Sequence, residues 1–178
     1  MTTAADHSAV RARQHEEFGG INWGSAFFGW LVTVGMATML IGLLSAAGAA
    51  FGLSDVSDAE TIGVAGGILL ILVLAAAYYC GGYVSGRMSR FDGARQGVAV
   101  WGLGLAVTVV LALAGTLFGA EYNVFEQLNL PRIPVDEGSL TAGAAVALVG
   151  VVVVTLGGAM AGGTVGERFH HRVESVGL

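Results

Sequence analysis

Four long stretches without an ionisable side chain constrain the fold of this chain more than any other feature of its sequence. They cover residues 24–51, 62–84, 97–119 and 140–162, and none of them contains Asp, Glu, Lys, Arg or His. Each stretch is long enough to cross a hydrocarbon layer about 30 Å thick as a helix. Their apolar residues occupy all sides rather than one face, as expected of helices that contact lipid and one another. Because a lone strand cannot satisfy its backbone in lipid, we predict an all-α membrane protein, a bundle of four transmembrane helices.

The composition supports this class and sets the predicted division of the chain. Hydrophobic residues make up 54% of the 178 residues and charged residues 12%, and the mean hydropathy is +0.73. Few residues remain outside the spans from which a soluble domain could form. We therefore predict a tail at 1–21, a transmembrane domain at 22–163 and a second tail at 164–178. The lipid bilayer is the expected partner, and no nucleic acid is expected.

The first apolar stretch could also be read as a cleaved signal peptide, because Arg11 and Arg13 precede it. Two observations argue against that reading. The stretch is longer than the usual apolar region of about 7 to 15 residues, and Glu16 and Glu17 dilute the basic flank. We therefore predict that it stays in the membrane as a helix.

The arginines predict the orientation of the chain. They fall before the first span, between the second and third, and after the fourth, at Arg11, Arg13, Arg87, Arg90, Arg95, Arg168 and Arg172. These segments share one side of a four-span protein. The two loops on the other side are acidic and contain one arginine, Arg132. Since positive charge is retained on the cytoplasmic side, we predict that both termini are cytoplasmic.

The two halves of the chain resemble each other. The second span contains Gly81-Gly82-x-x-x-Gly86, and the fourth contains Gly157-Gly158-x-x-x-Gly162. An Arg-Phe pair follows each pattern, at Arg90-Phe91 and Arg168-Phe169. The sequence therefore predicts two repeated helical hairpins, related by an axis along the membrane normal.

Small residues recur at helical spacing in the second and fourth spans. The rows are Gly82 with Gly86, and Gly158 with Gly162 and Gly166. Small residues four positions apart let two helix backbones approach closely in lipid. Packing among the four helices of one chain is the favoured reading, and oligomerisation through an exposed glycine face is the alternative.

The polar connections allow two interpretations each. Arg87, Arg90, Arg95, Arg168 and Arg172 are read first as topology signals, with binding of anionic lipid headgroups as the alternative. Asp92 is expected to cap the helix that follows it, after a turn at Asp92-Gly93. The segment at 121–138 is read as a cover over the bundle, or alternatively as a docking site.

The spans exclude several classes of function. Ion-coupled transporters and proton relays usually keep ionisable residues within the membrane, and these spans contain none. No nucleophile lies beside a base and no pair of carboxylates stands out, so we expect no enzyme, catalytic residue, cofactor or metal site. Cys80, the one cysteine, is read as a small apolar residue.

A non-enzymatic protein with a structural or partner-binding role is the favoured function, with a second copy or another membrane protein as partner. The alternative is a passive pore or small-solute carrier formed by an oligomer. Its lumen would be lined by the hydroxyl side chains of the spans, which are mainly Thr33, Thr38, Ser45, Thr108, Thr116 and Thr155.

Three segments carry a resemblance that covers nearly the whole chain. They are FGGINWGSAFFGW at 18–30, YYCGGYVSGRMSRF at 78–91 and LPRIPVDEG at 130–138. On these segments the chain resembles a family of small uncharacterised four-span integral membrane proteins from actinobacteria. The resemblance implies a bacterial plasma-membrane protein and transfers no functional residue.

Overall fold

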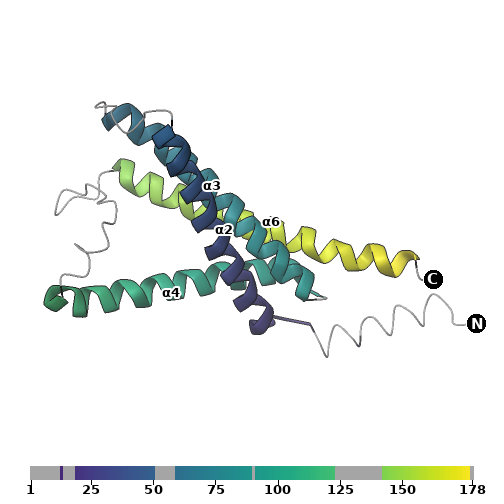
Figure 1. Ribbon diagram of the computed structural model, residues 1–178. Helices are drawn as coiled ribbons and strands as arrows, with labels where there is room; N and C mark the ends of the chain where they lie inside the picture. Colours follow the sequence, from purple (N-terminus) through teal and green to yellow (C-terminus); the bar gives the residue numbers. More distant parts are fainter. Residues whose placement is uncertain (1–12, 14–18, 51–58, 90, 123–141, 177–178) are drawn as a thin grey trace, which may run out of the picture.

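The structure is a computed structural model that describes residue 13 and residues 19–50, 59–89, 91–122 and 142–176. It contains helices α2 (Trp23–Ala50), α3 (Ala59–Met88), α4 (Gly93–Tyr122) and α6 (Ala142–Val176), and the described residues include no strand (Figure 1). All four helices are long and apolar enough to cross a membrane. The predicted all-α membrane protein with four helices is therefore confirmed.

The segments that could cross a membrane lie closer to one end of the molecule than the predicted spans do. The segments that could cross a membrane are Trp23–Gly48, Gly66–Met88, Gly93–Gly115 and Ala145–Arg168. The last helix extends further still, to Val176, so most of the predicted tail at 164–178 is helical. Segment 123–138 and Arg90 lie outside the described residues.

Asn22 fixes the start of α2. Its side-chain oxygen Oδ1 accepts the backbone N–H of Ser25 at 3.1 Å, and its carbonyl accepts the Ser25 hydroxyl at 2.9 Å. An Asn side chain that binds the third N–H of a helix satisfies one of the donors left free at the helix start. The direction in which α2 leaves the preceding segment is thereby set by local hydrogen bonds.

The four helices meet in one half of the molecule, which we call the crossing and define as residues 20–33, 77–104 and 155–168. Here α3 contacts α2, α4 and α6, and α4 also contacts α2 and α6 (Figure 1). The buried apolar residues all belong to the crossing and are small: Ala26, Ala77, Ala99, Val100 and Ala159. The core is therefore formed by close backbone approach rather than by large side chains.

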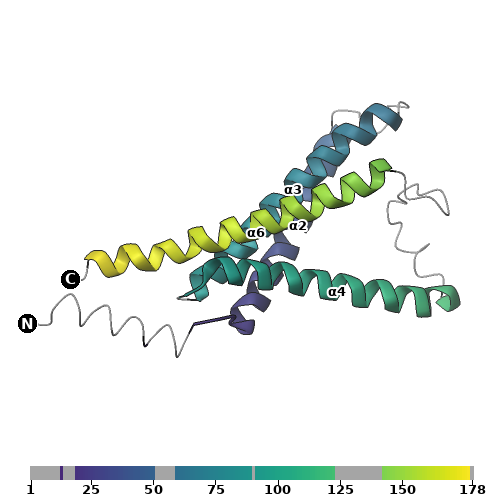
Figure 2. The same cartoon turned by 180° about the vertical axis from the view of Figure 1, so that it is seen from behind.

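Beyond the crossing lie the four distal halves, defined as residues 34–50, 66–76, 105–115 and 145–154, where α2 stays beside α3 (Figure 1, Figure 2). In both views α4 leads away from α3 and α6 (Figure 1, Figure 2). Large apolar side chains stay exposed there, including Met39 at 71% and Val146 at 72% of their surface. Lipid tails are as apolar as leucine, so this exposure carries little cost in a membrane.

Aromatic side chains lie where the helices begin to separate. A Cβ added to Gly104 of α4 would lie 2.6 Å from the Tyr78 hydroxyl oxygen and 3.4 Å from Trp30, so rings from α3 and α2 reach this backbone. One turn earlier on α4, Trp101 donates its indole N–H to the Thr155 hydroxyl of α6 at 3.1 Å. Elsewhere in the crossing, glycine and alanine allow close contact between helix backbones. At the level of Gly104 and Trp101, aromatic rings lie between the helices.

Candidate functional site at the crossing

The structure places the five predicted packing glycines at the contact between α3 and α6. A Cβ added to Gly82 or Gly86 would clash with the backbone of Ala159 or Gly163. The glycines of α6 face the backbone of α3 in the same way: Gly158 faces Ala75, Gly162 faces Tyr79, and Gly166 faces Tyr83 and Arg87. A methyl group at any of the five would require one helix to move.

The contact between α3 and α6 is locally two-fold symmetric. Gly82 lies on Ala159, and Gly162 lies on Tyr79, so the two glycines hold equivalent places on parallel helices. Gly86 and Gly166 form a second equivalent pair. This equivalence lies one helical turn further along α6 than the sequence alignment, which matched Gly82 with Gly158.

The outer helices do not follow this local symmetry. Helix α4 lies on both central helices, and its Gly93 and Gly97 pack against Gly163 and Ala159 of α6. Helix α2 packs against α3 through Gly29 and against α4, but over their described residues α2 and α6 make no contact. The two-fold relation therefore describes the central pair, while α2 and α4 occupy different positions around it.

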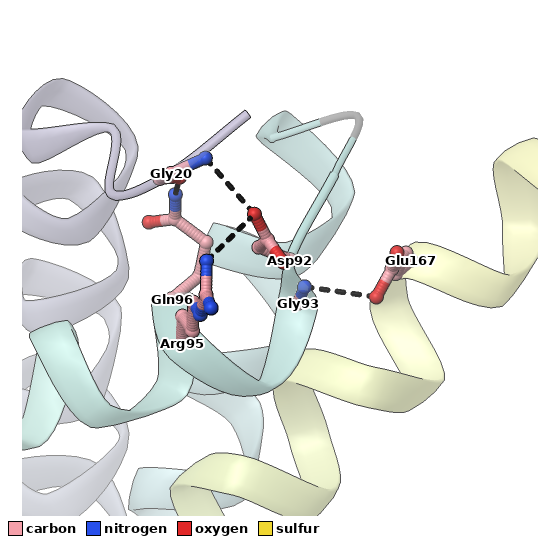
Figure 3. A network of polar contacts seen from close by, with 6 residues as sticks. All are labelled: Gly20, Asp92, Gly93, Arg95, Gln96 and Glu167. Carbon is pink, nitrogen blue, oxygen red and sulfur yellow. Dashed lines mark hydrogen bonds and ion pairs between the residues drawn. The ribbon is translucent and has the colours of Figure 1, made fainter. Parts of the chain in front are cut away.

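A buried amide joins three helices beside the glycine contacts. The side chain of Gln96 in α4 is fully buried. Its Oε1 accepts the hydroxyl of Ser25 in α2 at 3.1 Å and that of Ser85 in α3 at 3.5 Å. Its Nε2 donates to the carbonyl of Gly20 at 3.1 Å (Figure 3). Since a buried polar group is costly unless bonded, these hydrogen bonds fix how the helices sit around the amide.

Gly20, just before α2, is held at both of its backbone polar groups. Its N–H donates to Asp92 Oδ2 at 2.9 Å, while its carbonyl accepts from Gln96 (Figure 3). Its φ of 108° is a conformation that suits glycine. The segment before α2 is therefore fastened to the turn between α3 and α4.

Asp92 occupies the predicted capping position. Its backbone carbonyl accepts the N–H of Gln96 at 3.0 Å, as the residue before a helix does. Its φ of 59° is left-handed, which Asp tolerates better than most residues. The carboxylate also accepts from Arg95 at 3.5 Å, an ion pair whose arginine side chain is 66% exposed.

Glu167 of α6 supplies a second carboxylate at the start of α4. Its Oε2 accepts the N–H of Gly93, the first residue of α4, at 2.8 Å (Figure 3). A negative charge near a helix N-terminus interacts favourably with the helix dipole. Glu167 belongs to the segment predicted to be a tail, whereas the structure brings it to the crossing.

The predicted basic residues gather at the same end of the molecule, which we call the arginine end. Arg87 donates to the Tyr83 hydroxyl at 3.3 Å, with its guanidinium 5.9 Å from the centre of that ring. Arg95 pairs with Asp92, and Arg168 is exposed on α6. Arg172 belongs to α6, but its side chain lies outside the described part of the structure.

The chemistry of this cluster favours holding helices over catalysis. The hydroxyls of Ser25 and Ser85 lie beside the Gln96 amide oxygen, which is too weak a base to activate a hydroxyl nucleophile. The carboxylates of Asp92 and Glu167 accept backbone N–H groups of other segments. The hydrogen bonds of the crossing therefore position the segment before α2 and the starts of α2 and α4.

Most residues of this polar cluster were not predicted from the sequence. Gln96 precedes the predicted third span by one residue, and Ser25 and Ser85 lie at the ends of predicted spans, where polar residues are expected. A signal was present, because these polar residues fall at a similar depth in three different helices. Comparing the depth of polar residues between the predicted helices, rather than along each helix, groups these three residues.

Comparisons with protein-family models, with curated proteins and with solved structures found no match to this chain.

Proposed function

We propose that this multi-pass membrane protein has a non-enzymatic, structural role in the bacterial plasma membrane and associates with a partner through its distal halves. The arginine end faces the cytoplasm in this proposal, because Arg87, Arg95 and Arg168 from three helices lie at that end. The partner is a second copy of the chain or another membrane protein.

The observation that carries the proposal is the contrast between covered and uncovered glycines. Most glycines of the crossing, among them Gly82, Gly86 and Gly163, are covered by neighbouring backbones, while Gly102 and Gly157 there are open. In the distal halves a Cβ at Gly35, Gly42, Gly66, Gly67 or Gly150 would meet nothing within 4 Å. Small residues at uncovered helix positions allow another helix to approach closely. The crossing holds the four helices, and the distal halves carry the surface available for contact.

Mass measurement in native lipid discs tests this proposal. We expect the tagged protein, extracted with its surrounding lipid, to have a protein mass above the 18.1 kDa of one chain. Gly42→Leu should reduce the larger species, because a bulky side chain there blocks close approach without touching the crossing. Gly102→Leu, at an open glycine of the crossing, serves as the matched control variant away from the distal halves. A single-chain mass under several growth conditions would contradict the proposal.

The alternative function, a passive pore or small-solute carrier, has less support. Thr33 and Thr155 are buried within the crossing. Thr38 and Thr108 donate their hydroxyls to carbonyls of their own helices, at 2.9 and 2.8 Å. A hydroxyl whose proton is bonded to its own helix can only accept a hydrogen bond from a solute. Flux of ions or small neutral solutes through reconstituted liposomes, lost on replacing Thr38 with Val, would favour the pore instead.

A further inference from the structure

The contact between α4 and α6 follows a regular antiparallel register. Gly93 lies on Gly163, Gly97 lies on Ala159, and Trp101 is bonded to Thr155. Each step of four residues towards the C-terminus of α4 is matched by four residues towards the N-terminus of α6. The register fixes which residues would meet if the contact continued into the distal halves.

The same two helix faces continue uncovered beyond Trp101 and Thr155. At helical spacing the face of α4 continues through Thr108 and Leu111, and that of α6 through Val152 and Leu148. Leu111 and Leu148 are each 65% exposed, Val152 is 37% exposed, and Thr108 is also exposed. The two helices separate at this level in both views (Figure 1, Figure 2).

We propose that the distal halves of α4 and α6 close onto each other about the contact of Trp101 with Thr155, bringing Thr108 opposite Leu148. The register at the crossing sets this pairing, so closure extends an existing interface. In the closed arrangement, α6 covers the exposed face of α4. The inference needs no partner and is independent of the proposed function.

Closure carries no polar penalty at the positions involved. Leu111, Leu148 and Val152 are apolar, and the Thr108 hydroxyl is already bonded to the Gly104 carbonyl at 2.8 Å. Burying a bonded hydroxyl avoids the cost of an unsatisfied polar group. Ala112 and Ala145, next along the two faces, leave room for the backbones to approach. The crossing acts as a fixed pivot, and α4 and α6 have an open and a closed arrangement.

Disulfide formation in native membranes tests closure. In a Cys80→Ala background, the facing pair is Thr108→Cys with Leu148→Cys. The control pair, Val110→Cys with Val146→Cys, has the same register and lies at similar depth. By helical periodicity it points away from the contact, and the two valines are 63% and 72% exposed.

We expect the facing pair to crosslink under mild oxidation at least about tenfold faster than the control pair, because a disulfide requires Cα atoms roughly 4.4–6.8 Å apart. A second facing pair, Leu111→Cys with Ala145→Cys, guards against a variant that fails to fold. Helical circular dichroism confirms that each variant is folded. Crosslinking of both facing pairs at no more than the control rate would overturn closure, and faster crosslinking of either pair supports it.

Discussion

The crossing and the distal halves belong to the same four helices but differ in residue size, polarity and exposure. In the crossing, glycine and alanine bring backbones into contact around a buried amide. In the distal halves, large apolar side chains point outward, and several glycines have no neighbour within 4 Å. Lipid provides no hydrophobic drive for helices to associate. Helices therefore hold together where small residues and hydrogen bonds give close packing, and separate where side chains are bulky.

The largest expected effect comes from adding a side chain at the centre of the crossing. Gly163→Leu would clash with Gly93 of α4 and disturb the contact with Gly86 of α3. Overpacking of this kind should destabilise the protein by about 3 kcal/mol or more. Thermal unfolding in detergent, followed by helical circular dichroism, measures the loss. Gly157→Leu is the matched control on α6, since it faces open space. Equal losses for the two variants would remove the distinction between covered and uncovered glycines.

The next effect in size is the loss of the buried amide. Gln96→Leu leaves the Ser85 hydroxyl and the Gly20 carbonyl without this partner, while the Ser25 hydroxyl keeps its bond to the Asn22 carbonyl. We expect a loss of about 2 kcal/mol, because unsatisfied buried polar groups keep their full desolvation cost. The same unfolding measurement applies. Thr38→Val removes an exposed hydroxyl of the distal halves and should change stability little; a loss as large as that of Gln96→Leu would contradict the prediction.

A smaller effect is expected where Glu167 meets the start of α4. Glu167→Gln keeps a hydrogen-bond acceptor for the Gly93 N–H and removes the negative charge. We expect a loss of about 0.5 kcal/mol, the usual size of a charge effect at a helix N-terminus. Faster hydrogen exchange at the Gly93 amide reports it. Glu167→Ala, which removes the acceptor as well, should speed exchange further, and identical rates for the two variants would argue against a bond from this side chain.

The smallest effect is expected at an exposed apolar residue of the distal halves. Met39→Ala removes a side chain that is 71% exposed and lies outside the faces of α4 and α6 that we expect to close. Surface substitutions of this type usually change stability by less than about 0.5 kcal/mol. Thermal unfolding should barely shift. A change comparable to that of Gly163→Leu would mean that α2 is packed as tightly at its distal half as at the crossing.

The sequence alone determined the class of the protein, the four membrane-spanning helices that the described residues contain, and five of the glycines at helix contacts. It could do so because the length and polarity of one stretch decide by themselves whether it can span a bilayer. Gly82, Gly86, Gly158, Gly162 and Gly166 were singled out by local spacing and all lie at a helix contact.

Only the tertiary structure decided which helix faces meet, the register of α3 on α6, and the roles of Gln96 and Glu167. The hydrogen bonds from Gly20 to Asp92 and from Gly93 to Glu167 join residues 72 and 74 positions apart. The local sequence around Asp92 or Glu167 contains no signal for the distant residue that its carboxylate binds. The contact at Gly104 of α4 has the same origin, because the rings of Trp30 and Tyr78 reach it from two other helices.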